Sequence, residues 1–266
     1  MNSNRRFNVV ASDLDGTLFG PDHRLARRTI SVLQRARNAG IIVIAATGRA
    51  PISAMDCLAR YNVIDALICS NGSIVHDVAT NTTVRRFPIE AHHMTELFTS
   101  LDAALPGLSF CWEMDGSNAW DPGFDDIARL HPDLRSFRIG ERPDPSVQIT
   151  KVMANHPEHH QEDLAERLLP HLPGPLTIGC SGVNFVEITG VGVDKSLALS
   201  HVVSELGFTA SDVVAFGDNH NDLQMLQWAG HGVAVANAVD AAKSVADEVI
   251  GHHRDHSVAD FIESLI

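Results

Sequence analysis

A chain of 266 residues that is 44% hydrophobic can bury a substantial core, in one large domain or in two smaller ones. Its formal net charge of −13 and its lack of a basic tract argue against a nucleic-acid partner, whose phosphates need clustered Lys and Arg. The densest apolar run, residues 41–46, is far shorter than the roughly 20 residues that span a membrane. We therefore expect a cytoplasmic protein, a monomer or a small homo-oligomer, with neither nucleic acid nor membrane as its partner.

Alternating strands and helices are predicted for the first 70 residues. Short apolar runs predict the strands, and helical spacing that stops at Gly40 predicts the first helix. The order β-α-β-α-β is typical of a doubly wound parallel sheet. The predicted elements are a strand at 7–11, a helix at 26–39, a strand at 41–46, a helix from Pro51 and a strand at 66–69.

The pattern changes near residue 87 and returns near residue 190. Between these points predicted strands follow one another directly, which indicates antiparallel pairs in an α+β insert. We expect an α/β protein whose Rossmann-like parallel sheet comes from residues 1–86 and 189–266, around an insert of residues 87–188. The insert is predicted to contain helices at 94–105 and 162–169, strands at 109–114, 147–154, 176–180 and 184–189, and a turn-rich stretch at 115–123. After the insert we expect a helix through Leu206 and strands at 213–216 and 233–235.

The first predicted strand ends in two carboxylates, Asp13 and Asp15. Residues two apart in an extended segment point the same way, so both would project from the carboxyl end of the strand, where open α/β sheets bind ligands. Two neighbouring negative charges need a cation, and Mg²⁺ prefers carboxylates together with phosphate oxygens. The alternative is a plain turn in which Gly16 supplies backbone freedom after the strand.

Three further polar clusters lie at the ends of predicted core strands or the starts of core helices. Thr47-Gly48 precedes a helix and offers a phosphate cradle or, alternatively, only a turn and N-cap. Lys195 places a cation at a helix N-terminus, against the helix dipole unless an anion lies nearby; the alternative is a solvated surface lysine. The acidic loop 218–222 follows an apolar strand, with turn and capping chemistry as its alternative.

Together the four clusters indicate phosphoryl transfer. A phosphate ester repels nucleophiles, so a catalyst neutralises its charge and holds the attacking and leaving oxygens in line. Mg²⁺ and Lys195 could neutralise the charge. One carboxylate of the pair Asp13 and Asp15 could attack phosphorus, while the other protonates the leaving oxygen and later activates water.

Four motifs in a fixed order carry a family resemblance. The chain contains Asp13-Leu14-Asp15-Gly16-Thr17-Leu18, Ala46-Thr47-Gly48-Arg49, Asp194-Lys195 and Gly217-Asp218-x-x-Asn221-Asp222. They resemble the four motifs of the haloacid dehalogenase-like (HAD) hydrolases. Ser70-Asn71-Gly72, the length of the insert and Val186-Glu187-Ile188 are similar to the Cof-like phosphatases of subfamily IIB. The resemblance implies a HAD catalytic core, residues 1–86 and 189–266, and a substrate-specificity cap, residues 87–188.

The resemblance also implies a role for each polar residue. Asp13 is the implied nucleophile, and Asp15 is the implied general acid and base. Mg²⁺ would be held by Asp13, by the backbone carbonyl of Asp15 and by Asp218, with Asp222 as a ligand or a near neighbour. The implied phosphate-binding residues are Thr47, Gly48, Lys195 and Asn221.

We therefore expect a Mg²⁺-dependent phosphatase whose partner is a small phosphate ester, such as a sugar phosphate, hydrolysed through an aspartyl phosphate. A phosphomutase or phosphotransferase acting on phosphosugars is an open alternative. A non-catalytic phosphate sensor is another, although a general base at Asp15 would hydrolyse a phosphoaspartate signal. Arg49 could pair with phosphate or with an acidic group of the cap, and His220 could touch the leaving group or face water. Residues 111–121 could also touch the leaving group, although Trp112 is expected in the core.

Overall fold

The structure is a computed structural model that describes residues 7–114, 117–130, 137–139, 142–143, 147–181 and 183–266. The chain forms two compact units. The first unit combines the two ends of the chain, Met1–Arg85 and Asp194–Ile266, and the second consists of Arg86–Val193. None of the helices in these described ranges is long and apolar enough to cross a membrane.

The first unit is built on a sheet that has, in its described part, the strand order β14-β13-β12-β1-β2-β3-β4-β5. The strands from β14 to β3 are parallel to their neighbours, whereas β4 is antiparallel to β3. The strands are β1 (Val9–Ser12), β2 (Ile42–Ala46), β3 (Ala66–Cys69), β4 (Ile74–Asp77), β5 (Thr82–Arg86), β12 (Val213–Gly217), β13 (His231–Ala234) and β14 (Glu248–Val249). The helices are α1 (Arg27–Asn38), α2 (Pro51–Leu58), α6 (Lys195–Glu205), α7 (Leu223–Trp228), α8 (Asp240–Val245) and α9 (Ser257–Glu263).

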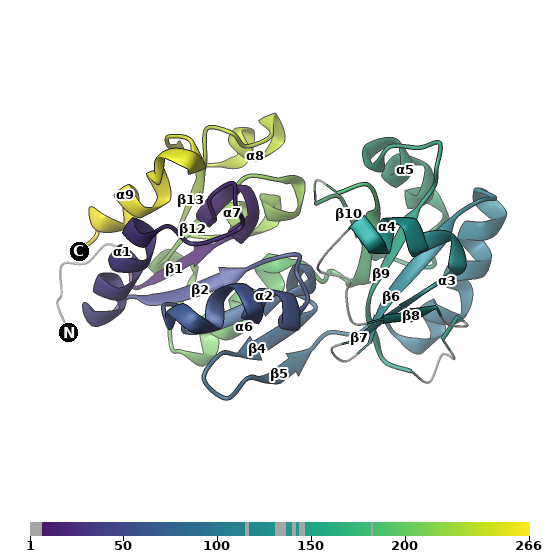
Figure 1. Cartoon of the computed structure of the whole chain (residues 1–266), viewed down its shortest axis with the longest axis horizontal. Helices are drawn as coiled ribbons and strands as arrows, with labels where there is room; N and C mark the ends of the chain where they lie inside the picture. Colours follow the sequence, from purple (N-terminus) through teal and green to yellow (C-terminus); the bar gives the residue numbers. More distant parts are fainter. Residues whose placement is uncertain (1–6, 115–116, 131–136, 140–141, 144–146, 182) are drawn as a thin grey trace. The chain divides into compact units, whose positions relative to one another are not determined.

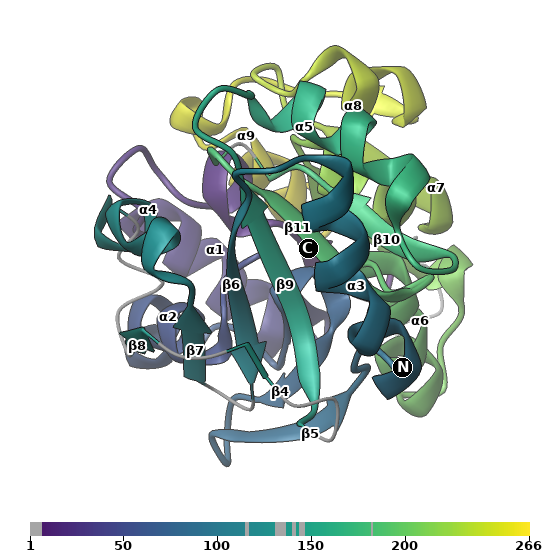
Figure 2. The same ribbon diagram turned by 90° about the vertical axis from the view of Figure 1, so that its right-hand side faces the viewer.

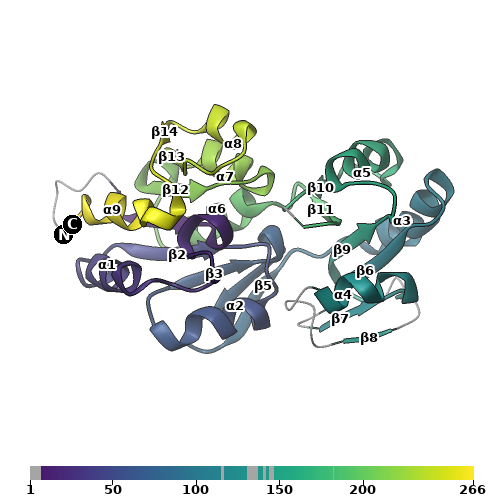
Figure 3. The ribbon, with the colours of Figure 1, turned by 45° about the horizontal axis from the view of Figure 1, so that its top comes forward.

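Helices cover both faces of this sheet (Figures 1 and 3). Right-handed crossovers between parallel strands place α1 and α2 on one face, where α9 packs on α1. On the opposite face α6 packs on α7. Because strands covered on both faces cannot hold solvated side chains, β1, β2 and β12 are apolar and almost wholly buried. The predicted α/β fold with a doubly wound parallel sheet is confirmed.

The order of the strands reverses beside β1. This strand lies between β12 and β2, and Ser12 pairs with Phe216 on one side and with Ala45 on the other. The carboxyl ends of the three strands therefore meet at one edge of the sheet. Such a switch point, where the connections leave in opposite directions, is where open α/β sheets bind ligands.

The second unit contains a mainly antiparallel sheet whose described strands have the order β10-β11-β9-β6-β7-β8. Figure 2 shows β6 and β9 side by side in this sheet, with α3 running across it. Only the described pair β7 and β8 is parallel. The elements are α3 (Ala91–Ala104), β6 (Ser109–Met114), β7 (Ser117–Trp120), α4 (Asp125–Leu130), β8 (Phe137–Ile139), β9 (Ile149–Asn155), α5 (Gln161–Leu168), β10 (Leu176–Gly179) and β11 (Val186–Val191).

Alternation along β6 separates two apolar clusters. Phe110 and Trp112 point to the face covered by α3 and α5, where Phe98 meets both rings edge-on. Cys111 belongs to the cluster on the other face, together with Phe124 from the turn before α4. Trp112 is thus a core residue, as expected.

Several elements differ from those predicted. The turn-rich stretch after β6 was expected to lack a strand, yet residues 117–120 form β7, because pairing with β6 outweighs the weak strand propensity of Ser117 and Asn118. The predicted turn at 115–116 lies outside the described residues. After Ser70-Asn71-Gly72 the chain continues into β4 and β5, which the sequence pattern did not reveal. Leu206 was expected on the buried helix face but is 45% exposed, since α6 ends at Glu205.

Candidate active site

The first acidic motif begins where β1 ends. The backbone N–H of Asp13 donates to the carbonyl of Phe216 at 2.9 Å, which continues the pairing of β1 with β12 by one residue. The chain then turns tightly through Leu14–Leu18, with Gly16 at φ +85°. A Cβ at Gly16 would lie 2.4 Å from Oδ2 of Asp218, so only glycine allows this turn to approach the loop after β12. The turn brings the first and last predicted motifs together.

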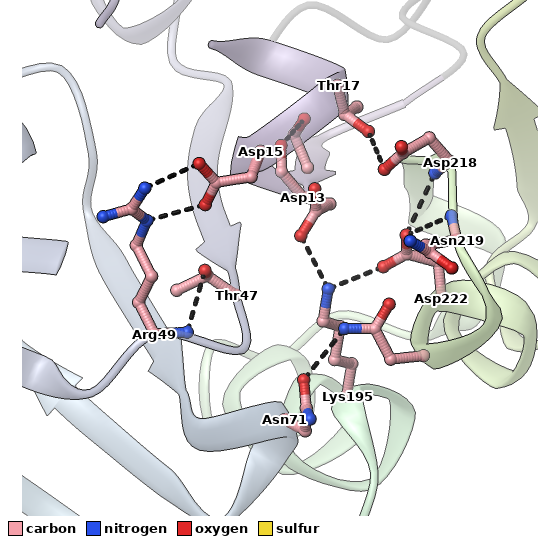
Figure 4. Close-up of polar contacts among 12 residues, drawn as sticks. Asp13, Asp15, Thr17, Thr47, Arg49, Asn71, Lys195, Asp218, Asn219 and Asp222 are labelled. Carbon is pink, nitrogen blue, oxygen red and sulfur yellow. Dashed lines mark hydrogen bonds and ion pairs between the residues drawn. The ribbon is translucent and has the colours of Figure 1, made fainter. Parts of the chain in front are cut away.

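Lys195 is the centre of a buried ionic cluster. Its side chain is 0% exposed, and its Nζ donates to Oδ1 of Asp13 and to Oδ1 of Asp222, each at 2.7 Å (Figure 4). Burial lowers the pKa of Lys195, but the two carboxylates outweigh it and leave this pKa raised. The alternative of a solvated surface lysine is therefore wrong, and the cation at the start of α6 is balanced by two anions.

The end of α6 that carries Lys195 is fixed from two sides. Asp194 caps the helix by accepting hydrogen bonds from the backbone N–H groups of Ser196 and Leu197 at 2.8 and 2.9 Å. Gly72 packs so closely against this turn that a Cβ there would lie 1.9 Å from the carbonyl oxygen of Asp194. The Asn71-Gly72 turn and the helix carrying Lys195 are thus held as one piece.

Asp222 organises the loop after β12. Its second carboxylate oxygen, Oδ2, accepts from the backbone N–H groups of Asp218 and Asn219, both at 3.0 Å. Asp218 in turn accepts a hydrogen bond from the Thr17 hydroxyl at 3.0 Å. Both oxygens of Asp222 therefore have donors within the protein, which is the arrangement of a residue that positions its neighbours.

Three carboxylates converge at this edge of the sheet. Asp13, Asp218 and Asp222 each bring one oxygen within 4.8 Å of the others. Burial, followed by the charge of Asp222, raises the pKa of Asp218 to about 7. Burial also raises the pKa of Asp13 well above its usual range, although Lys195 opposes the shift. A set of hard oxygen donors whose charge one lysine does not neutralise fits a divalent cation such as Mg²⁺.

The second predicted cluster lies at the end of β2. The backbone N–H of Thr47 donates to Ile68 of β3 at 2.8 Å, and the Thr47 side chain accepts from the backbone N–H of Arg49 at 3.1 Å. The backbone N–H of Asn71 donates to the carbonyl of Thr47 at 3.1 Å. The Asn71 side chain accepts from Nδ2 of Asn221 at 3.0 Å. Asn71 therefore links the second motif to the fourth.

Asp15 faces a different set of partners. Arg49 donates to both of its oxygens, from Nε to Oδ2 at 2.6 Å and from Nη2 to Oδ1 at 2.7 Å. His23 Nδ1 lies 2.7 Å from Oδ1. Burial raises the pKa of Asp15, but the hydrogen bonds and charge of Arg49, together with His23, outweigh it and lower the pKa. In the described structure Arg49 thus pairs with Asp15, a partner that neither of its two predicted interpretations included.

All eight site residues proposed from the sequence lie at this one edge of the first unit. Figure 4 labels all of them except Gly48 and Asn221. Asp13, Lys195, Asp222 and Asp218 are joined as described above, Asn221 reaches Thr47 and Gly48 through Asn71, and Asp15 has its own pair with Arg49. Their catalytic, phosphate-binding and metal-binding roles stay predictions. Sequence reasoning missed the contacts of Thr17, His23 and Asn71. Thr17 and Asn71 belong to motifs that the sequence analysis singled out, the hexapeptide and the Ser70-Asn71-Gly72 turn. His23 belongs to no such motif.

Comparison with known proteins identifies the family. A family model described as haloacid dehalogenase-like hydrolase matches residues 10–262. The chain belongs to this family. It is 30% identical over 268 residues to a pyridoxal phosphate phosphatase of Escherichia coli, covering 96% of this chain and 97% of that protein. It is also 30% identical over 271 residues to an HMP-PP phosphatase of Serratia proteamaculans, covering 97% and 94%.

A solved structure supports the same fold. The structure of a sugar phosphatase of HAD subclass IIB matches with a TM-score of 0.82 at 21% identity, covering 97% of this chain and 100% of that one. The predictions of the superfamily and of a phosphatase as the enzyme class are confirmed. The fold shared with a subclass IIB enzyme agrees with the predicted Cof-like IIB branch.

Proposed function

We propose that this HAD hydrolase is a Mg²⁺-dependent phosphatase that hydrolyses a small phosphorylated metabolite through an aspartyl phosphate on Asp13. The observation that carries the proposal is the contact of the buried Lys195 ammonium with Asp13, beside the oxygens of Asp218 and Asp222. A structural ion pair would need one carboxylate for one lysine. Three carboxylates beside one lysine leave excess negative charge, which a divalent metal ion can balance so that a phosphoryl group can approach.

In the first step, Asp13 attacks phosphorus and displaces the alcohol. Lys195 holds the attacking carboxylate by Oδ1 and contributes positive charge next to the phosphoryl oxygens. When bound to Asp13, Asp218 and the Asp15 carbonyl, Mg²⁺ supplies further positive charge that offsets the charge of the phosphoryl group. Asp15 donates a proton to the leaving oxygen, so that it departs as a neutral alcohol.

In the second step, Asp15 takes a proton from water, which attacks the phosphoaspartate and releases phosphate from Asp13. Thr47, Gly48 and Asn221 are proposed to bind the phosphoryl oxygens in both steps. The contact of Asn221 Nδ2 with Asn71 occupies one N–H of the amide and leaves the other for an anion. One N–H of Asn221 thus positions its side chain, and the other is available for the phosphoryl group.

We further propose that the second unit is the cap that selects the alcohol. Its sheet carries polar side chains among apolar ones, including Lys151, whose Nζ donates to Glu187 at 2.7 Å. The relatives act on different phosphate esters, a pyridoxal phosphate and HMP-PP, which supports a small metabolite as the substrate class. Pyridoxal phosphate, HMP-PP and sugar phosphates are the first candidates.

The test is phosphate release from a panel of these esters, with Mg²⁺ and with excess chelator. We expect turnover of at least one ester only with the metal, and none by the Asp13→Asn variant. Mass spectrometry of acid-quenched wild-type enzyme is expected to show one added phosphoryl group on the peptide that contains Asp13. Formation of an isomeric phosphosugar without free phosphate would favour a mutase instead. Turnover by Asp13→Asn at the wild-type rate would exclude the aspartyl phosphate.

A further inference from the structure

His23 lies in a tight loop between the hexapeptide turn and α1. The loop closes on itself, since Gly20 N–H donates to the Arg24 carbonyl at 2.9 Å and His23 N–H donates to the Gly20 carbonyl at 3.0 Å. His23 adopts a left-handed backbone with φ +55°, which is uncommon for a residue other than glycine. Its side chain is 66% exposed, so burial of the ring does not explain why it occupies this strained position.

The left-handed conformation of the loop places the His23 ring in contact with Asp15. Oδ1 of Asp15 lies 2.7 Å from His23 Nδ1 and 2.7 Å from Arg49 Nη2. Within the described residues Oδ2 accepts one hydrogen bond, from Arg49 Nε at 2.6 Å. A carboxylate oxygen accepts about two hydrogen bonds, so Oδ1 is filled and Oδ2 keeps an open position.

Arg49 has anchors of its own, although its Nη2 also lies 3.4 Å from His23 Nδ1. Its Nη1 donates to the Ser53 hydroxyl on α2 at 3.1 Å, and its guanidinium stacks over the ring of Phe19 at 5.8 Å from the centroid. Arg49 therefore approaches Asp15 from the side of α2, whereas His23 approaches from its own loop. Two donors from two separate segments fix both the position and the rotation of one carboxyl group.

We propose that His23 is a positioning residue, which occupies Oδ1 of Asp15 and directs Oδ2 toward the leaving oxygen of the substrate. This inference rests on the proposed function, in which Asp15 is the general acid and base. In the step concerned, the bond between phosphorus and the ester oxygen breaks, and a bond between phosphorus and Asp13 forms. The proton on Oδ2 of Asp15 moves to the ester oxygen, which leaves as the alcohol.

A positioning role predicts a dependence on the leaving group. An alkyl phosphate releases a basic alkoxide that needs the proton, whereas p-nitrophenyl phosphate releases a stable phenolate that does not. The constant kcat/KM reports the steps up to departure of the alcohol, and kcat also includes hydrolysis of the phosphoaspartate, where Asp15 acts as the base. Loss of His23 should therefore affect these constants differently for the two esters.

The test compares His23→Gly, which keeps the left-handed backbone but removes the ring, with His23→Asn, which keeps both the backbone and a side-chain donor. For His23→Gly we expect kcat/KM to fall about tenfold with an alkyl phosphate substrate and to stay unchanged with p-nitrophenyl phosphate. With p-nitrophenyl phosphate, kcat should fall and a burst of phenolate should appear. His23→Asn should recover most of the loss.

Asn62→Gly is the matched control, because Asn62 is exposed at φ +47° in the same unit and lies outside the proposed site. It should leave all the constants unchanged. An equal fall of kcat/KM with both esters for His23→Gly, or no fall with either, would overturn the positioning role while leaving the phosphatase proposal intact. If the wild-type enzyme hydrolysed neither ester with Mg²⁺, the proposed function itself would fail.

Discussion

The ammonium of Lys195 lies 2.7 Å from the carboxylate of Asp13, although 182 residues separate them in the chain. The same ammonium contacts Asp222, so two buried carboxylates depend on one buried cation. Burying such a cluster of charges costs folding free energy, because each charged side chain loses its hydration. Its cost is understandable if the cluster serves to hold a reactive carboxylate in an anion-binding site.

Lys195→Met is predicted to destabilise the metal-free protein. The change leaves Asp13 and Asp222 buried without their cation, and breaking such a pair typically costs about 3–5 kcal/mol of unfolding free energy. Urea unfolding at pH 8 in chelator measures this loss, and phosphate release should be abolished in the same variant. Lys243→Met on α8 provides the control, with an expected change below about 0.5 kcal/mol. Equal stability of the two variants would contradict the role assigned to the cluster.

The raised pKa of Asp218 predicts how the stability of the protein depends on pH. Its pKa is raised from the ordinary 3.8 to about 7 in the folded protein. Between these values the folded state binds a proton that the unfolded state does not, so the free energy of unfolding should fall as pH rises from about 4 to about 7. The raised pKa of Asp13 acts in the same direction. Melting temperatures in chelator should therefore decrease over this range.

Two changes should weaken that pH dependence. Asp218→Asn removes one of the titrating groups and should make the decrease in melting temperature shallower. Mg²⁺ binds the ionised carboxylates, and at ten times its dissociation constant it should add about 1.4 kcal/mol to the unfolding free energy near pH 7. An unchanged pH dependence in Asp218→Asn would show that the titrating group lies elsewhere.

Gly16→Ala tests the approach of the hexapeptide turn to the carboxylates that are proposed to bind metal. Its Cβ would lie 2.4 Å from Oδ2 of Asp218, so we expect that carboxylate to move and Mg²⁺ affinity to fall by about tenfold or more. The dissociation constant comes from Mg²⁺ titrations followed by melting temperature and by phosphate release. Gly207→Ala is the control, because Gly207 has φ +81° and no atom within 4 Å of the added Cβ. Equal metal affinities in both variants would rule out the steric argument.

Asp15→Asn is expected to separate the two chemical steps. Without a general acid or base, kcat should fall by roughly 10²- to 10⁴-fold. With p-nitrophenyl phosphate the first step needs no proton, so the phosphorylated enzyme should accumulate and be visible by mass spectrometry after acid quench. Unphosphorylated enzyme throughout the reaction would argue that Asp15 is not the base for the second step.

Asn71→Gly is expected to weaken transition-state binding through Asn221. Glycine tolerates the φ of +54° at this position, so the change removes the hydrogen bond to Asn221 Nδ2 without straining the backbone. A hydrogen bond of about 0.5–1.5 kcal/mol corresponds to a fall of roughly two- to tenfold in kcat/KM. Asn81→Gly, also at φ +54° but in the turn between β4 and β5, should have no effect. An equal kcat/KM in the two variants would refute the link.

The sequence predicted the core of the site because each cluster follows a buried strand or begins a helix. Apolar runs are long enough to locate β1, β2 and β12, and parallel pairing then brings the residues after them to one edge. Lys195 was harder to interpret, since a lysine at a helix start is as often solvated. Its complete burial follows from packing of Gly72 and the carboxylates around it, which no local pattern contains.

The partners of Asp15 and Asn221 could not be predicted in the same way. His23 and Asn71 occupy left-handed turns, where the sequence indicates a change of direction but not the target of the side chain. The strand β7 was missed for a related reason, because its polar residues form a strand only when β6 is available for pairing. Long-range contacts of short polar segments are decided by tertiary structure.

The insertion of the second unit has a consequence for biosynthesis. On the ribosome, β1 and Asp13 emerge early, whereas Lys195 and the strand β12 that pairs with β1 follow only after the whole second unit has been made. The nascent chain therefore exposes an unpaired edge of β1 and an aspartate without its lysine during most of translation. A product that stops before Lys195 contains Asp13 but not the lysine that pairs with it, so such incomplete chains lack the buried ion cluster of the finished site.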